Sequence, residues 1–338
     1  MSHHPTRRGR KSARLLLTGL AAAAMLVVSA CTSSADVSSS AGAGSTEGRT
    51  SQKIAFDYPF TSLGVYAILV DMMNENAAEI GWSVVTTDNP NAAIDRQITN
   101  LTGLANSDVA AIITFPMEPA AVKTIMQQAQ ANGIKWLNYG AHIEGEDGYI
   151  DFAGEATARA QVEGFVKWAE EQGIDEGTVL LTVDDTSDLG RTRTVGLREG
   201  MAELAPNFTI VEQSSVSTEQ GLAAGRAELA KNPHLVAALG LNDDTTVGLA
   251  QAFKEAGFTA ADRVYVGGND GSPQVLQALR AQDSVLRSTV VLDMAKTGQA
   301  LIDMPVQLVE GTGDGRYVAD FELVWAGSPE IDRYLPAE

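Results

Sequence analysis

From residue 53 onward, short apolar runs rich in β-branched residues alternate with longer segments of helical periodicity. This alternation is typical of parallel sheets flanked by helices. The predicted strands are 54–56, 83–86, 109–114, 135–138, 179–183, 209–213, 235–239 and 264–267. The helices expected in the first half are 65–80, 92–105 and 119–132, and a helix at 155–172 opens the second. The sequence therefore predicts an α/β fold with two doubly wound parallel-sheet domains of similar size.

The first thirty residues have the features of an export signal. An apolar run at 15–30 follows a basic segment, and no acidic residue precedes Asp36. The run has 16 residues, whereas a membrane-spanning helix needs roughly 20. We therefore expect residues 1–30 to be a cleaved signal peptide. The pair Arg7 and Arg8 leaves the general secretory and twin-arginine routes both open.

The signal ends in Val28-Ser29-Ala30-Cys31, which looks like a bacterial lipobox. Cys31 is the chain's only cysteine, so neither an intramolecular disulfide nor a cysteine-rich zinc site can form. Lipid attachment at Cys31 is predicted, and the alternative is an ordinary signal beside a chance cysteine. Residues 31–52 are rich in Ser, Gly and Ala, which predicts a flexible linker between membrane and folded body. The expected location is extracytoplasmic, with a lipid anchor in the cell membrane.

The net charge excludes one class of partner. Without residues 1–30 the chain keeps 19 of its 24 basic residues and all 43 acidic ones, a net charge of −24. Nucleic-acid binding is not expected, because phosphate contacts require clustered Lys and Arg.

The common catalytic signatures are missing from the sequence: it has no Gly-x-Ser-x-Gly elbow, no phosphate-binding P-loop and no His-Glu-x-x-His helix. The adjacent carboxylates at 184–185 and 243–244 do not provide the glycosidase geometry, which places two carboxyls across a scissile bond. His142 and Glu144 are only a weak metal pair. We therefore expect no enzyme, no metal and no cofactor, with a lipoprotein hydrolase as the weaker alternative.

The order of motifs from residue 53 to about 325 resembles the type I periplasmic binding proteins, in particular their ribose-binding-like, sugar-binding branch. The segments that carry the resemblance are KIAFDYPFTSLGVY, LGRTRTVGLREGM, NPHLVAALGLNDDTTVGLAQAFKEAG, VYVGGNDGSPQVLQAL and LRSTVVLDMAKTG. The resemblance implies a three-crossover hinge between an N-terminal lobe, residues 53–153 with 293–321, and a C-terminal lobe, residues 154–292 with 322–338.

The same resemblance implies the function. The chain is expected to be the substrate-binding lipoprotein of an ABC importer, a monomer that passes a small sugar or polyol to a membrane permease. The alternative within the same fold is a sensory co-receptor for a small signal molecule.

A sugar presents hydroxyls and weakly apolar C–H faces, so its site needs planar polar groups and aromatic walls. By resemblance, Arg191 binds ligand hydroxyls while Arg193 braces the domain; the alternative for Arg191 is surface pairing with nearby aspartates. Asn242 is the implied ligand contact on the next loop, and it can also cap the following helix. Asp270, after another strand, is the implied acceptor of hydrogen bonds from ligand hydroxyls.

In the first half, the family's polar and aromatic contacts match the loop and helix start near residue 60. Tyr66 is there as a stacking residue or as simple core. The full set of candidates from this half is Ser62, Val65, Tyr66, Phe115, Asn138 and Tyr139.

Two departures from the ribose-binding pattern bear on the ligand. Gly140-Ala141 stand where ribose binders have an Asp-Arg pair, and Leu292 stands where they have a glutamine. Asp293 is a candidate that partly replaces the missing polarity. The expected ligand is therefore a sugar other than ribose, a polyol, or a less hydroxylated compound.

Overall fold

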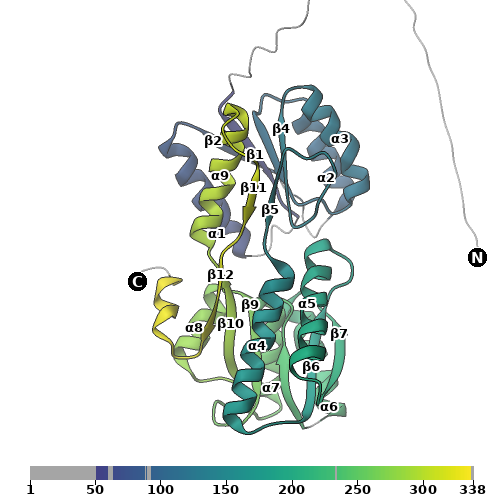
Figure 1. Cartoon of the computed structure of the whole chain (residues 1–338), viewed down its shortest axis with the longest axis vertical. Coiled ribbons are helices and arrows are strands. Elements are labelled where there is room, and N and C mark those ends of the chain that lie inside the picture. Colours follow the sequence, from purple (N-terminus) through teal and green to yellow (C-terminus); the bar gives the residue numbers. More distant parts are fainter. Residues whose placement is uncertain (1–50, 60–63, 88, 90–92, 233, 336–338) are drawn as a thin grey trace, which may run out of the picture. The chain divides into compact units, whose positions relative to one another are not determined.

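The computed structural model describes residues 51–59, 64–87, 89, 93–232 and 234–335. Its strands form two sheets, each flanked by helices on both faces (Figure 1). Cys31 and Ser62 lie outside the described residues, as do the predicted signal peptide and nearly all of the predicted linker. In the part of the chain that is described, no helix combines the length and apolarity needed to cross a membrane.

The first sheet has the strand order β11-β5-β4-β3-β1-β2, and its neighbouring strands are all parallel. Its strands are β1 (Lys53–Asp57), β2 (Ser83–Thr86), β3 (Ala111–Thr114), β4 (Lys135–Tyr139), β5 (Gly148–Asp151) and β11 (Arg316–Val318). The helices that flank it are α1 (Gly64–Glu79), α2 (Ile94–Ala105), α3 (Pro119–Ala131) and α9 (Met294–Glu310). We call this unit the first lobe.

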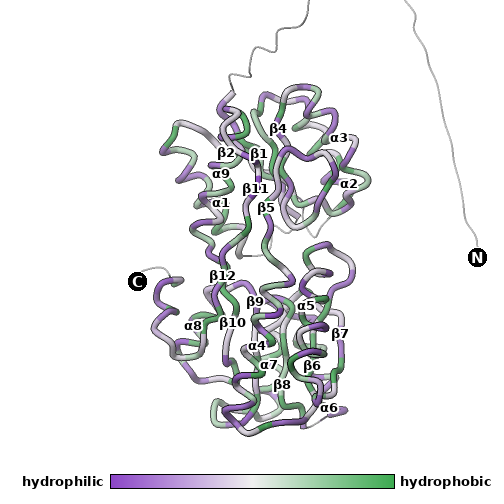
Figure 2. The backbone as a smooth tube through the Cα atoms, in the orientation of Figure 1, coloured by the Kyte–Doolittle hydropathy of each residue, from purple (hydrophilic) through white to green (hydrophobic). Residues whose placement is uncertain are grey.

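The first lobe has a core on each face of its sheet, because side chains along a strand alternate between faces. In β4, Leu137 and Tyr139 belong to the core under α1 and α9. Trp136 belongs to the core under α2 and α3. Apolar residues are concentrated along the strands (Figure 2), as expected for a sheet covered on both sides.

The second sheet has the order β12-β10-β9-β8-β6-β7, in which only β12 is antiparallel to its neighbour among the described strands. Its strands are β6 (Gly177–Val183), β7 (Phe208–Ser214), β8 (Leu235–Leu239), β9 (Tyr265–Asp270), β10 (Leu286–Leu292) and β12 (Phe321–Trp325). The helices of this second lobe are α4 (Gly154–Gln172), α5 (Asp188–Leu204), α6 (Thr218–Lys231), α7 (Asp243–Glu255), α8 (Pro273–Ala281) and the 3-10 helix η2 (Pro329–Arg333).

The chain passes between the two sheets at three places: after β5, after β10 and after β11. The two doubly wound parallel-sheet domains predicted from the sequence are confirmed. Phe321 pairs with Leu292 in the second sheet, so β12 begins one residue before the expected change of lobe at 321/322. The strand pattern missed β5, β10, β11 and β12. The strands β5 and β11 have only four and three residues, too few for a periodic signal.

Candidate functional site

Parallel strands present the loops at their carboxyl ends on one edge of a sheet, where open α/β folds bind ligands. On this edge of the second sheet, β6 is followed by Asp184, β8 leads to Asn242, and β9 ends at Asp270. Three sequence-distant polar residues therefore occupy the ligand edge of the second lobe.

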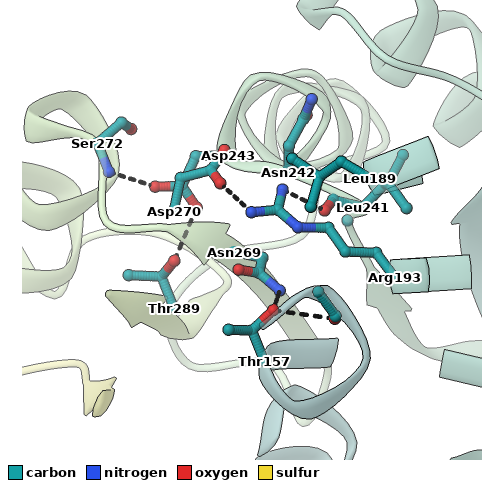
Figure 3. Close-up of polar contacts among 12 residues, drawn as sticks. Thr157, Leu189, Arg193, Leu241, Asn242, Asp243, Asn269, Asp270, Ser272 and Thr289 are labelled. Carbon is teal, nitrogen blue, oxygen red and sulfur yellow. Dashed lines mark hydrogen bonds and ion pairs between the residues drawn. The ribbon is translucent and has the colours of Figure 1, made fainter. Parts of the chain in front are cut away.

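Asp270 and Arg193 form an ion pair at this edge (Figure 3). The Arg193 Nη2 atom donates to Asp270 Oδ1 at 2.5 Å, and Nη1 donates to the carbonyl of Leu241 at 3.2 Å. The Arg193 side chain is 6% exposed, whereas that of Asp270 is 24% exposed. Arg193 thus joins α5 to β9 and to the loop after β8, which fits the bracing role that the resemblance implies for it.

Asp270 has a backbone φ of 138°, which a residue with a side chain rarely adopts. Such conformations cost on the order of 1–3 kcal/mol and are concentrated at functional sites. The fold holds the Asp270 carboxylate in place against this cost.

Asp243 lies beside this pair and is buried. Its carboxylate accepts from the amide of Ser272 at 2.5 Å and from Thr289 Oγ1 at 2.7 Å. Burial, and secondly the Asp270 carboxylate, raise the pKa of Asp243 to about 7. Gly268 makes room for this carboxylate, because a side chain at that position would overlap it. The Asp270 carboxylate is therefore paired with Arg193 and also acts on the buried Asp243 carboxylate.

Two buried polar atoms next to Asp270 have no hydrogen-bond partner in the described part of the chain: Arg193 Nε and Asn269 Oδ1. The amide nitrogen of Asn269 donates to Thr157 Oγ1 at 3.1 Å. Since buried polar atoms are nearly always paired, these two atoms mark free hydrogen-bonding capacity at this edge.

The loop after β6 is organised by Asp184, which is buried and accepts from the hydroxyls of Thr186 and Ser187 at 2.5 and 2.6 Å. Burial alone would raise the pKa of Asp184, but these hydrogen bonds outweigh it and lower the pKa. Arg191 lies on the first turn of α5, forms an ion pair with Asp188 and donates to the carbonyl of Thr186 at 2.9 Å. Its guanidinium therefore lies on the loop surface, and its role as a ligand contact stays a prediction.

Asn242 caps α7. Its Oδ1 accepts from the amide of Thr245 at 2.8 Å, and the Thr245 hydroxyl completes a capping box. The other end of the amide donates to the carbonyl of Val216 at 3.2 Å. The cap that the sequence allowed is therefore present, and it leaves Asn242 one amide hydrogen for a ligand.

The ligand edge of the first lobe is built from aromatic rings. The Tyr58 ring is stacked between Phe56 and Tyr66, with centroids 5.2 and 5.1 Å apart, and Tyr139 meets Phe115 edge-on at 5.3 Å. Burial raises the pKa of both Tyr66 and Tyr139, so both phenols stay neutral. We call this set the aromatic platform, and its members are Phe56, Tyr58, Tyr66, Phe115, Tyr139 and Phe152.

Asp57, which the sequence analysis did not single out, is a buried polar centre on the opposite face of β1 from Phe56. Its signal was present, because an acidic residue directly ends an apolar strand. The neutral donors to its carboxylate, at 2.5–2.8 Å, are Thr87, Asn89, Gln97 and Thr114.

The remaining candidates are placed as follows. Asn138 is buried away from the platform, accepts from Trp136 Nε1 at 2.9 Å and donates to Glu146 at 2.5 Å. Asp293 caps α9 by accepting from the amide of Lys296 at 3.0 Å, next to the second crossover. Val65 lies in the first turn of α1. The structure thus brings Tyr66, Phe115 and Tyr139 together but leaves Asn138 outside their group.

The sequence profile of the periplasmic binding protein domain family matches residues 54–313. This architecture, with ligand edges built at the carboxyl ends of the strands, is that of a two-lobed binding protein. The chain belongs to the periplasmic binding protein family, which confirms the resemblance seen in the sequence and makes it a binding protein rather than an enzyme.

Solved structures share the fold. A solute-binding protein of Actinobacillus succinogenes with bound D-allose is 20% identical, with a TM-score of 0.73, covering 80% of this chain and 96% of that one. The Caulobacter myo-inositol binding protein is also 20% identical at a TM-score of 0.73, covering 86% and 100%. A Mycobacterium smegmatis protein in complex with β-D-fucofuranose is 18% identical at a TM-score of 0.74, covering 85% and 94%. No curated protein sequence matches this chain.

Proposed function

We propose that this chain is the extracytoplasmic solute-binding component of an ABC importer, which captures a small sugar or polyol between its two lobes and delivers it to a permease. The observation that carries the proposal is the Arg193–Asp270 pair at the ligand edge of the second sheet. A guanidinium donates and a carboxylate accepts, so a hydroxyl group can bind to both at once. The proteins of similar fold bind D-allose, myo-inositol and β-D-fucofuranose, which are all polyhydroxylated.

The proposed contacts combine the sequence candidates with the geometry. Asp270 accepts hydrogen bonds from ligand hydroxyls, Asn242 lies on the loop after β8, and Arg191 lies on the first turn of α5 at the same edge. To these we add Arg193 and Asn269, whose unpaired buried atoms offer a donor and an acceptor. On the first lobe the proposed contacts are Ser62, Val65, Tyr66, Phe115, Asn138 and Tyr139, with Asp293 at the second crossover.

We further propose that the protein is a monomeric lipoprotein. Residues 1–30 are the signal peptide, Cys31 carries the lipid and residues 31–52 are the linker. The lobes comprise 53–153 with 293–321 and 154–292 with 322–338. Replacing Cys31 with Ser should move the protein from the membrane fraction to the soluble fraction and abolish incorporation of labelled fatty acid. Unchanged membrane fractionation would contradict lipid anchoring without affecting the proposed ligand.

The test of the ligand class is thermal unfolding of the purified protein against pentoses, hexoses, polyols, nucleosides and amino acids. A ligand at about 100 times its dissociation constant stabilises the folded state by about 2.7 kcal/mol, which raises the unfolding midpoint visibly. A sugar or polyol is expected to give this shift. A shift from only a nucleoside or an amino acid would keep the fold and overturn the proposed ligand.

A further inference from the structure

Among the described residues of the first lobe, the polar groups near the ligand edge bind mainly one another. A carboxylate offers about four acceptor positions, and Asp57 receives two hydrogen bonds on each of its oxygens. Asp57 therefore has no position left for a ligand hydroxyl.

The amide groups near Asp57 are also engaged. Gln97 donates to the Phe115 carbonyl at 2.8 Å and to Asp57, and its oxygen accepts from the amide of Met117 at 3.0 Å. Asn138 is held at both ends of its amide and keeps one amide hydrogen, on the face of β4 away from the platform. The Tyr139 hydroxyl is buried and donates to the Tyr66 hydroxyl, so it keeps only acceptor capacity for a ligand hydroxyl.

The rest of this edge, as far as its residues are described, is aromatic ring surface that carries the Tyr58 and Tyr66 hydroxyls. Phe56 and Tyr139, which are 0% and 1% exposed, support the more exposed Tyr58 and Tyr66. Phe115 occupies the space above Gly140, where any side chain would overlap its ring. No polar group can therefore extend from position 140, and the end of β10 adds only the buried, apolar Leu292.

The second lobe has the opposite character. Asp270 remains 24% exposed in its side chain, and Arg193 Nε and Asn269 Oδ1 are buried without partners in the described residues. These groups favour a ligand with several hydroxyls on the side that meets the second lobe.

We propose, building on the function proposed above, that the ligand is a deoxy or O-alkyl sugar or polyol with one hydroxyl-poor face. That face lies on the aromatic platform, and the hydroxyls of the other side bind Asp270, Arg193 and Asn269. Aromatic rings gain from contact with C–H groups, whereas a hydroxyl desolvated against them without a partner loses its hydrogen bonds to water.

The test is isothermal titration of the purified protein with matched pairs: each 6-deoxyhexose or methyl glycoside against its fully hydroxylated parent. In the pair that binds most tightly, the deoxy or methylated member should bind about 10- to 100-fold more tightly. Equal or tighter binding of the parents would overturn the inference and leave the proposed function standing. No binding by any sugar or polyol, with binding by another solute class, would overturn both.

A variant pair tests the first lobe's share of the selectivity. Leu292→Gln introduces an amide beside the platform, and this amide can bind the extra hydroxyl of the parent sugar. The preference for the deoxy or methylated ligand should therefore fall to less than about threefold. Leu292→Met keeps the apolar surface at similar volume and should retain the preference. An equal loss of preference in both variants would contradict the role assigned to this surface. Should Leu292→Gln not fold, the matched ligand pairs on the native protein still decide the proposal.

Discussion

The two lobes share one fold, but their ligand edges have different chemistry. Among the described residues of the first lobe, the polar groups around Asp57 bind one another, and the aromatic platform lies on the other face of β1. In the second lobe Arg193 pairs with Asp270, whose charge also acts on the buried Asp243, and buried polar atoms remain unpaired in the described residues. Equivalent strand ends in the two lobes can therefore contact different parts of one ligand. In the proposed binding mode, the first lobe contacts the C–H surface of the ligand and the second lobe binds its hydroxyls.

The largest expected loss of sugar affinity follows from substitution of Asp270 in the second lobe. Asp270→Ala should abolish detectable sugar binding, because it removes the acceptor and leaves Arg193 without its ion pair. Asp270→Asn keeps an oxygen for Arg193 and should fold like the native protein while still binding at least about 100-fold more weakly. Titration calorimetry measures both variants, with Glu203→Gln as the control, because this exposed carboxylate in the last turn of α5 pairs with Arg159 away from the ligand edge. If Asp270→Asn kept the native sugar affinity, the ligand hydroxyls would not bind at Asp270 and Arg193.

The stability of the folded protein is expected to depend on pH through the ionisation of Asp243. Because the pKa of Asp243 rises from 3.8 to about 7 on folding, the native state holds a proton that the unfolded state releases. The stability from this group is present below about pH 4 and is lost as the pH rises to about 7, a change of roughly 2–4 kcal/mol. Asp243→Asn can keep the bonds to Ser272 and Thr289 and should remove this part of the pH dependence. Urea unfolding at pH 4, 5.5 and 7.5 measures it; an unchanged slope in the variant would place the ionisation elsewhere.

The rigidity of the aromatic platform can be measured through Gly140, which lies against the Phe115 ring. Gly140 has a φ of 72° and faces the Phe115 ring, so Gly140→Ala combines backbone strain with a clash and should cost about 3 kcal/mol. Gly133 has a φ of 76° with no atom within 4 Å of an added methyl group, and Gly133→Ala should cost only about 1 kcal/mol. Chemical denaturation compares the two. Equal losses would mean that the Phe115 ring moves freely and does not form a fixed surface.

The smallest effect on stability is expected at Arg191. Its guanidinium is exposed and pairs with Asp188 on the surface, so Arg191→Met should change the free energy of unfolding by less than about 1 kcal/mol. The same variant tests the ligand contact that the resemblance implies. A tenfold loss of sugar affinity with unchanged stability supports that contact, whereas unchanged affinity would limit Arg191 to the loop surface.

The sequence predicted the fold well, because the alternation of strands and helices is a local signal repeated many times. It predicted the placement of Asp270 and Asn242 for the same reason, since both follow apolar strands. It did not identify the Asp57 network, whose members lie up to 57 residues apart and meet only in the folded sheet. The partner of Asp270 was also hidden, because which of Arg191 and Arg193 turns inward depends on the rotation of α5 against the sheet.

The most direct test of the division between the lobes is a crystal structure of the protein with the sugar or polyol that stabilises it most. Most ligand hydroxyls are expected to bind Asp270, Arg193 and Asn269, and a hydroxyl-poor face of the ligand is expected to lie on Tyr58 and Tyr66. A ligand most of whose hydroxyls are bound by first-lobe side chains such as Asp57 or Gln97 would contradict this division.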